Sequence, residues 1–222
     1  MAWLKRLATP KWWPIEKKTK KFVAVPRGPH RKLRSLPLLI VLREVLKYAE
    51  TAKEAKTVIT RGDVVVDGRR IKDPNFGVGV FDVIELPKLK ISYRVIPSKY
   101  GLQLLEVDDP KLKICKIIDK KILKQGRIQL NLDCGRNLIA DKQYKTSGSV
   151  LIELPKQNIV QHFELGKGSL VIVTEGSNAG LIAPIKELEK DKVWLESDKK
   201  LIEVPKKLIT VVGKERPTLK LE

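Results

Sequence analysis

Apolar residues recur at helical spacing in the region after Ser35. The apolar positions follow one another at intervals of three or four residues: Leu39, Leu42, Val45, Leu46 and Ala49. Pro37 suits the first turn of a helix, because its missing N–H would be unpaired there anyway. The pattern therefore predicts a helix that begins at Ser35.

A second helix and a hairpin are predicted immediately afterwards. The stretch from Thr51 to Glu54 fits a capping box, Ala55, Val58 and Ile59 form an apolar stripe, and Gly62 suits the C-terminal stop. Val64–Val66, the turn Asp67-Gly68 and Arg69–Ile71 then indicate two antiparallel strands. A further strand is predicted over Phe81–Leu86, after a loop that contains Gly77 and Gly79.

After Pro87 the pattern changes to short apolar runs separated by turn residues, spaced by about eight to twelve residues, which is typical of a small barrel or sandwich. The first set of expected strands is Ile91–Ile96, Leu102–Val107, Ile114–Ile118, Arg127–Leu132, Val150–Leu154 and Ile159–Phe163. The second set, after Gly166-Lys167-Gly168, is Leu170–Thr174, Leu181–Ile185, Val193–Leu195, Ile202–Val204 and Ile209–Val212.

The charge of the chain is concentrated at its N-terminus. The 222 residues carry a net charge of +19, and residues 1–40 hold 11 Lys or Arg against one acid, Glu16. No regular period persists over residues 1–35, so we expect an extended basic arm that orders on a partner. Trp12 and Trp13 would stack on bases, pack on a neighbouring molecule or cover the protein's own core. A charge this positive and this uneven points to a polyanionic partner, and solubility alone explains it less well.

Several classes of function lack support in the sequence. The longest apolar stretch, Leu36–Leu42, is far shorter than the roughly 20 residues a membrane helix needs. The N-terminus has no apolar core of a signal peptide. Cys115 and Cys134 show no Cys-x-x-Cys spacing and no neighbouring histidine, so we expect no metal site and two buried thiols in a reducing cytosol. His30 and His162 are the two histidines, and neither stands in a catalytic pattern.

The helix–helix–hairpin unit carries basic residues away from its apolar stripe. Lys53 and Lys56 lie on the second helix and Arg61 ends it, while Arg69, Arg70 and Lys72 flank the Asp67-Gly68 turn. Together they could present a cationic face to phosphates or to an RNA groove. A merely solvated polar face is the alternative, because residues 41–89 hold nine basic against eight acidic residues.

This unit resembles a known family of RNA-binding domains. The segments Leu42–Leu46, Ala52–Ile59 and Arg61–Gly68, followed by Ile71 and Asp73-Pro74, are similar to the S-four-type domain, which binds structured RNA. The family usually has a glycine before the final Asp-x-Ile. That position is Phe81 here, and we expect the departure to affect a turn and not the binding face.

A wider resemblance covers nearly the whole chain. Leu4–Trp13 and Gly28–Leu38 are similar to the N-terminal signature of the small-subunit ribosomal protein S-four-e family, and Val171–Ile182 resembles its KOW motif. The KOW family often has a basic residue and a third glycine where this chain has Leu181 and Ala183. The resemblance therefore implies a tight turn through Gly176 and Gly180, and we assign no RNA contact to this loop. The short polar tail is similar to that of archaeal members.

The resulting expectation is an α+β fold, mostly β. It comprises a basic arm (1–40), an S-four-type domain (41–88), a β-rich middle domain (89–166), a small KOW-like barrel (167–213) and a tail (214–222). The resemblance implies a structural, non-enzymatic protein of the cytoplasmic small ribosomal subunit, without cofactor or membrane, that binds ribosomal RNA and neighbouring ribosomal proteins and forms no homo-oligomer. The expected RNA contacts are Arg27, His30, Arg31, Lys32, Arg34, Lys53, Lys56, Arg61, Arg69, Arg70 and Lys72.

Two other classes remain as alternatives. An RNA-modifying enzyme such as a pseudouridine synthase could carry the S-four-type unit as an appendage, but it would need a catalytic domain that the remaining β-rich residues do not suggest. A transcription elongation factor could carry the KOW-like segment and would bind RNA polymerase. RNA turnover or polymerase capture would distinguish these alternatives from a ribosomal protein.

Overall fold

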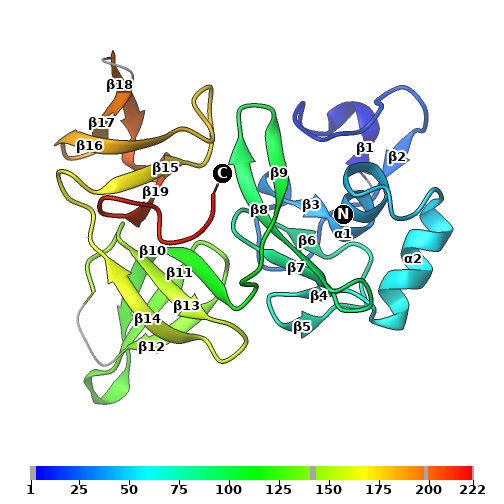
Figure 1. The fold of residues 1–222 in the computed structure, drawn as a ribbon, viewed down its shortest axis with the longest axis horizontal. Coiled ribbons are helices and arrows are strands. Elements are labelled where there is room, and N and C mark those ends of the chain that lie inside the picture. The colour runs from blue at the N-terminus through cyan, green and yellow to red at the C-terminus, as the bar shows by residue number, and fades with distance from the viewer. Residues whose placement is uncertain (1–3, 141–143, 198–199, 222) are drawn as a thin grey trace. The chain divides into compact units, whose positions relative to one another are not determined.

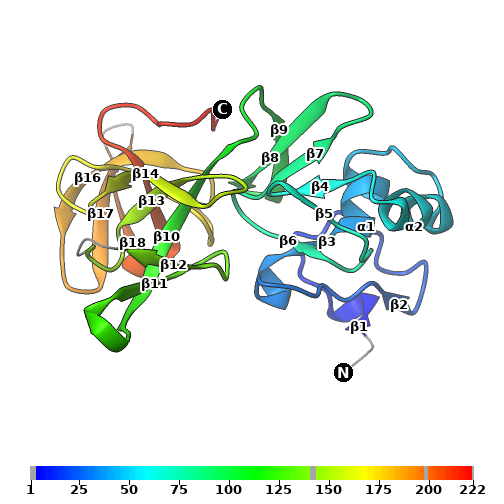
Figure 2. The ribbon, with the colours of Figure 1, turned by 90° about the horizontal axis from the view of Figure 1, so that it is seen from below.

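A computed structural model describes residues 4–140, 144–197 and 200–221 of the chain (Figures 1 and 2). The chain divides into two compact units. The N-terminal unit comprises Met1–Val95 and Tyr100–Lys111, and the C-terminal unit comprises Ile96–Lys99 and Leu112–Glu222. Residues 1–3 of the expected arm lie outside the described residues.

The N-terminal unit combines a few helical turns with a five-stranded sheet of order β5-β4-β7-β8-β9 and two short strand pairs, β1-β2 and β3-β6. Its core joins the helices to the sheet through side chains such as Leu38, Ile59 and Ile84, each fully buried. The elements are β1 (Leu4–Lys5), η1 (Arg6–Ala8), β2 (Phe22–Val23), η2 (Lys32–Arg34), β3 (Leu36–Pro37), α1 (Leu38–Ile40), η3 (Val41–Val45), α2 (Ala52–Arg61), β4 (Val65–Val66), β5 (Arg69–Arg70), β6 (Gly77–Val78), β7 (Val83–Leu86), β8 (Ile91–Ser98) and β9 (Gly101–Glu106).

Helix α2 has the ends that its sequence predicts. The Thr51 hydroxyl accepts a hydrogen bond from the Glu54 N–H at 3.2 Å, and the Glu54 carboxylate accepts one from the Thr51 N–H. Hydrogen bonds to the carboxylate, from the Thr51 side chain first and then from the N–H groups of Thr51 and Glu50, lower the pKa of Glu54. Gly62 ends the helix with a φ of 79°, a left-handed conformation that glycine adopts at little cost. Ala55 and Ile59 are its buried residues.

The helix expected from Ser35 is shorter, and its buried residues are Leu38 and Ile40–Leu42, whereas Leu39 of the expected stripe is only partly buried. Leu36 and Pro37 pair as β3 with β6, α1 spans only Leu38–Ile40, and the next turn is the π-helical η3. Pro37 therefore caps the helix and does not lie in its first turn. Because Leu36–Leu42 is apolar at every position, the spacing of apolar residues could not identify the buried face of the helix. The π-helical turn also changes the number of residues per turn, so a period of 3.6 does not hold there.

The predicted hairpin forms between β4 and β5, with Val66 opposite Arg69. Asp67 and Gly68 both have positive φ (51° and 74°), as a two-residue hairpin turn requires. The Asp67 carboxylate accepts a hydrogen bond from the Val83 N–H at 3.0 Å, which ties the turn to β7. Phe81 precedes β7 with a φ of 64° and a buried ring, so the departure from the family's glycine does fall in a turn.

Strands β8 and β9 belong to a different sheet from the one we expected. The sequence grouped them with the middle domain, whereas β8 pairs with β7, Leu86 standing opposite Ile91, and β9 follows β8 in the same sheet. The residues after Pro87 form the tight turn between β7 and β8, where the Leu89 N–H donates to the Leu86 carbonyl. A hairpin turn and a domain boundary use the same residue types, so the sequence pattern did not separate them.

The arm is packed on the N-terminal unit and is not extended. Trp13 is 3% exposed within the core, and Trp12, Ile15 and Val23 pack against that core. The Arg6 guanidinium donates to the Glu16 carbonyl at 2.6 Å, which closes a loop between β1 and β2. Trp13 thus covers the protein's own core. The arm contains few apolar residues, and basic residues and prolines separate them, so the sequence showed no periodic pattern from which this packing could be predicted.

The described residues of the C-terminal unit form two five-stranded sheets, ordered β12-β11-β10-β13-β14 and β18-β17-β16-β15-β19. The expected strands are present, and β12 is one that the sequence analysis did not predict. The elements are β10 (Leu112–Ile122), η4 (Lys124–Gly126), β11 (Ile128–Leu132), β12 (Asn137–Ala140), β13 (Ser149–Glu153), β14 (Asn158–Phe163), β15 (Leu170–Val173), β16 (Ile182–Leu188), β17 (Lys192–Ser197), β18 (Lys200–Pro205), η5 (Lys206–Leu208) and β19 (Ile209–Gly213).

A buried lysine joins the two sheets of the C-terminal unit. Lys116 of β10 is 8% exposed, and its ammonium donates to the carbonyls of Lys206, Lys207 and Ile209 at 2.8, 3.1 and 2.7 Å. Three carbonyls satisfy the three donors of the ammonium, so the burial of this charge is compensated.

The fold class is confirmed: the chain is mostly β with few helices. Within the described part of the chain, no helix is long and apolar enough to cross a membrane.

Candidate RNA-binding surface

Helix α2 and the β4-β5 hairpin bring six of the expected contacts onto one unit. Lys53 and Lys56 of α2 are exposed, whereas Ala55 and Ile59 of the same helix are buried. Helix α2 is capped at both ends, so the backbone that carries these lysines is well defined. The other four expected contacts of this region are exposed at the end of the helix and around the hairpin turn: Arg61, Arg69, Arg70 and Lys72.

The left-handed turn at Gly62 brings the hairpin next to the end of the helix. A Cβ placed on Gly62 would lie 3.8 Å from the Lys72 side chain, although the two residues are ten positions apart. Lys72 thus lies beside the residue that follows Arg61. The end of helix α2 and the residues after the β4-β5 hairpin therefore share one cationic region.

A second group of expected contacts lies in the loop before β3. Arg27 forms a parallel bridge with Phe76, where the Gly77 N–H donates to the Arg27 carbonyl at 2.6 Å. The loop then enters the short helix η2, and its basic side chains Arg31, Lys32 and Arg34 are exposed. Backbone bonds to residues 75–77 therefore hold these cations on the N-terminal unit.

His30 differs from the other expected contacts because its side chain points inward. It is only 10% exposed, and its Nε2 lies 2.8 Å from Oδ2 and 3.0 Å from Oδ1 of Asp82. Asp82 is 2% exposed and also accepts a hydrogen bond from the Gly79 N–H. In this structure His30 holds the loop in place, and its ring is not presented to solvent.

Most of the exposed cations expected to contact RNA form no ion pair among the residues that the structure describes. Lys88 pairs with Asp63 and Arg43 pairs with Glu44, both at 2.7 Å. By contrast, nine of the ten exposed expected contacts, all but Arg34, have no ion-pair partner among the described residues. Unpaired cations on a folded surface are available to phosphates.

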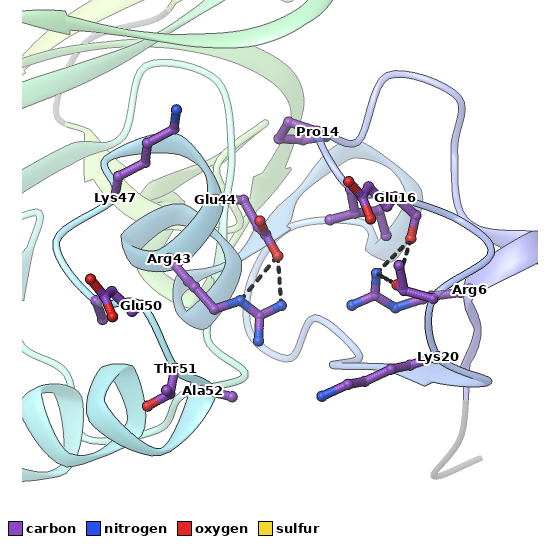
Figure 3. A pocket seen from close by; sticks show the side chains of 13 residues that line it. Arg6, Pro14, Glu16, Lys20, Arg43, Glu44, Lys47, Glu50, Thr51 and Ala52 are labelled. Atoms are coloured by element: carbon purple, nitrogen blue, oxygen red, sulfur yellow. Dashed lines mark hydrogen bonds and ion pairs between the residues drawn. The ribbon is translucent and has the colours of Figure 1, made fainter.

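A groove on the same unit adds cations that the sequence analysis missed. Its volume is about 900 Å³, and it lies between the packed arm and the start of α2. Figure 3 shows the guanidinium groups of Arg6 and Arg43 on opposite sides of it. Both guanidiniums are engaged, by the Glu16 carbonyl and by Glu44 respectively.

Lys20 and Lys47 are the exposed lysines of this groove, and neither has a hydrogen-bond or ion-pair partner among the described residues. No sequence signal links them, because they come from the arm and from the residues after η3. Recognising that Trp13 anchors the arm would have placed Lys20 on this unit.

Comparison with known proteins decides the family. The S4 domain model matches residues 36–84, and the model described as ribosomal family S4e matches residues 89–159. The small ribosomal subunit protein eS4 of Methanocella arvoryzae is 45% identical over 84% of this chain and 80% of its own length. That of Methanocaldococcus jannaschii is 40% identical over 98% of this chain and 96% of its own length.

The chain belongs to the ribosomal family S4e.

A solved member of the S4e family has the same fold. The crystal structure of the 30S ribosomal protein S4e from Thermoplasma acidophilum superimposes with a TM-score of 0.72 at 27% identity, covering 82% of this chain and 96% of that one. S4e proteins are structural, non-enzymatic components of the small ribosomal subunit, so the prediction of a non-enzymatic ribosomal protein is confirmed. The two alternatives, a modifying enzyme and a polymerase-bound factor, are not supported.

The KOW-like segment of this S4e chain forms the loop between β15 and β16. Gly176 and Gly180 have φ values of 96° and 87°, which confirms that both serve the turn. A Cβ on Gly180 would come within 2.9 Å of the Pro97 carbonyl oxygen, so the loop packs closely on residues 97–98.

Proposed function

We propose that this protein binds small-subunit ribosomal RNA through the cations of its N-terminal unit and thereby stabilises the folded RNA. The observation that carries the proposal is the set of exposed lysines and arginines on the N-terminal unit, which contains the S4 domain match over residues 36–84. The proposed contacts are Arg27, Arg31, Lys32, Arg34, Lys53, Lys56, Arg61, Arg69, Arg70 and Lys72.

The physical basis is neutralisation of phosphate charge. Each cation that meets a phosphate releases counterions from the RNA, which makes the affinity fall with rising salt. Contacts of this kind fix position and orientation more than they read sequence. Lys20 and Lys47 extend the proposed surface into the groove, where an RNA backbone could lie along the start of α2.

His30 has a supporting role in this proposal. Its bond to Asp82 holds the loop that carries Arg31, Lys32 and Arg34. His30 was expected to contact RNA directly, and we now assign it a positioning role. By holding the loop before RNA binds, it lowers the entropic cost of ordering three neighbouring cations on binding.

The salt dependence of RNA binding tests the hairpin directly. The full-length protein is titrated with a small-subunit RNA transcript at several salt concentrations. Replacing both Arg69 and Arg70 by alanine should reduce the salt slope by about 2, one for each phosphate contact. Lys167→Ala/Lys190→Ala, two exposed lysines of the C-terminal unit, is the matched control and should leave the slope nearly unchanged. An unchanged slope for the arginine variant would remove the hairpin from the surface.

The cellular setting is also part of the proposal. We propose a cytoplasmic protein that joins the subunit as a single copy beside other ribosomal proteins and forms no homo-oligomer. Co-sedimentation of a tagged copy with the small subunit at both low and high salt supports this setting. A position at the top of the gradient, or with RNA polymerase, contradicts it.

A further inference from the structure

The C-terminal unit brings its two cysteines together, although they are nineteen positions apart in sequence. Cys115 lies in β10, and Cys134 lies in the turn between β11 and β12. Both thiols are buried, with 0% and 3% exposure, and their sulfurs are 3.4 Å apart. The sequence analysis expected two buried thiols and no metal site, because Cys-x-x-Cys spacing was absent. In a Cys-x-x-Cys motif the two thiols are close because they are neighbours in sequence. Here the turn between β11 and β12 brings Cys134 next to Cys115.

A carboxylate completes the cluster. Asp133 precedes Cys134 in the turn, and its ligand atom and the two sulfurs all lie within 4.8 Å of one another. The Asp133 side chain is fixed, because its Oδ1 accepts a hydrogen bond from the Lys116 N–H at 3.0 Å, while the Asp133 N–H donates to the Lys116 carbonyl at 3.0 Å. Asp133 is thereby held against β10, next to Cys115.

We propose that Cys115, Cys134 and Asp133 form a binding site for one thiophilic divalent cation of the zinc type. Two thiolates and one carboxylate are ligands that Zn²⁺ accepts, and three protein ligands leave a fourth position for water. Asp133 is half-buried, whereas both cysteines are buried.

The spacing of the sulfurs fits shared coordination. Zinc–sulfur bonds of about 2.3 Å at tetrahedral angles place two sulfurs roughly 3.8 Å apart, whereas a disulfide requires about 2.05 Å. The observed 3.4 Å needs to widen by only a few tenths of an ångström to hold a metal ion.

The charges also balance. A dication bound by two thiolates and one carboxylate carries a residual charge of −1, which is costly in a buried site unless it is compensated. Lys113 of β10 is 1% exposed, and its ammonium acts electrostatically on both sulfurs. This buried cation would offset part of the negative charge of the loaded site.

Metal titration of the full-length, reduced protein tests the site. Co²⁺ should bind one equivalent and develop the sulfur-to-metal charge-transfer and intense visible bands of tetrahedral thiolate coordination, and Zn²⁺ should displace it. Zn²⁺ should also raise the melting temperature, since a ligand that binds only the folded state stabilises it. Absence of these bands, with both thiols shown to be reduced, overturns the proposal.

Variants assign the ligands. Cys134→Ser should abolish the charge-transfer band, and Cys115→Ser should do the same. Asp133→Asn keeps the acceptor for the Lys116 N–H and should weaken binding by at least about tenfold, as changes around metal sites commonly do. Asp119→Asn, an exposed carboxylate of the same strand, is the matched control and should bind like the unaltered protein. Undiminished binding by either cysteine variant or by Asp133→Asn would refute the proposed ligand set.

Discussion

His30 Nε2 lies 2.8 Å from the Asp82 carboxylate, across fifty-two positions of sequence, and thereby fastens the loop before β3 to the turn before β7. Both side chains are largely buried. A Cβ on Gly79 would overlap the His30 ring, so the segment from Gly79 to Asp82 is shaped around this histidine. The relationship links the basic loop to the family's RNA-binding unit and leads to the first prediction.

Replacing His30 by alanine should lower the free energy of unfolding by about 2 kcal/mol, because it leaves a buried carboxylate without one of its hydrogen-bond donors. The loop that carries Arg31, Lys32 and Arg34 should become more sensitive to protease, and RNA affinity should fall with it. Urea unfolding and limited proteolysis measure the two effects. Arg31→Ala, an exposed neighbour, should change stability by less than about 0.5 kcal/mol. Equal stability of the two variants would show that the His30–Asp82 contact is not structural.

Lys116→Met should destabilise the C-terminal unit by about 3 kcal/mol. The change leaves the buried carbonyl of Ile209 and the part-buried carbonyls of Lys206 and Lys207 without their shared donor. Lys120→Met removes a charge from an exposed position of the same strand and should have little effect. Hydrogen exchange followed along β19 should report the difference. Unaltered protection in the Lys116 variant would contradict the role assigned to its ammonium.

Phe81→Gly should destabilise the protein although it restores the glycine that the family usually has at this position. Relief of the left-handed conformation at φ 64° is worth roughly 1–2 kcal/mol. Loss of a buried aromatic ring costs about 3–5 kcal/mol, so the loss of packing outweighs the relief of strain. Lys90→Gly provides the converse control, because Lys90 also has a positive φ, of 57°, but is exposed. This variant relieves strain without loss of packing and should be slightly more stable than the unaltered protein. Thermal unfolding of both variants measures the balance, and stabilisation by Phe81→Gly would reverse this conclusion.

Glu85 makes stability depend on pH. Burial, followed by repulsion from Asp67, raises the pKa of Glu85 above its ordinary value of 4.5. The folded state therefore binds this proton more tightly than the unfolded state, and the contribution of Glu85 to stability is most favourable below pH 4.5 and declines as pH rises through the folded pKa. Glu85→Gln should raise the melting temperature at pH 7 and lose that advantage in acid. A gain independent of pH would contradict this explanation.

Local signals were sufficient wherever the determining residues were close together in sequence. Thr51, Glu54 and Gly62 define the ends of α2 within twelve residues, and Asp67-Gly68 defines the hairpin within two. The cations of α2 and the hairpin could therefore be placed on the surface from sequence. The phase of the helix after Ser35 could not be predicted, because an unbroken apolar run contains no periodic contrast.

Long-range packing accounts for the features that the sequence did not reveal. His30 was interpreted as an RNA contact because it lies among arginines, and its buried partner Asp82 is distant in sequence. The same distance concealed the approach of Cys134 to Cys115 and the anchoring of the arm by Trp13. In each case the fold brings together residues that are distant in sequence, and neither composition nor local spacing predicts such a contact.

Strand β8 gives the chain an unusual path: Ile91–Val95 belong to the N-terminal unit, Ile96–Lys99 to the C-terminal unit, and Tyr100–Lys111 to the N-terminal unit again. During synthesis the N-terminal unit can complete its sheet once Lys111 has left the ribosome that makes it. Pro97 and Ser98 already belong to strand β8 at that point, whereas Gly180, against which they pack, is synthesised later. The RNA-binding unit is thus the first part of the newborn chain that can fold, before the C-terminal unit has been synthesised in full.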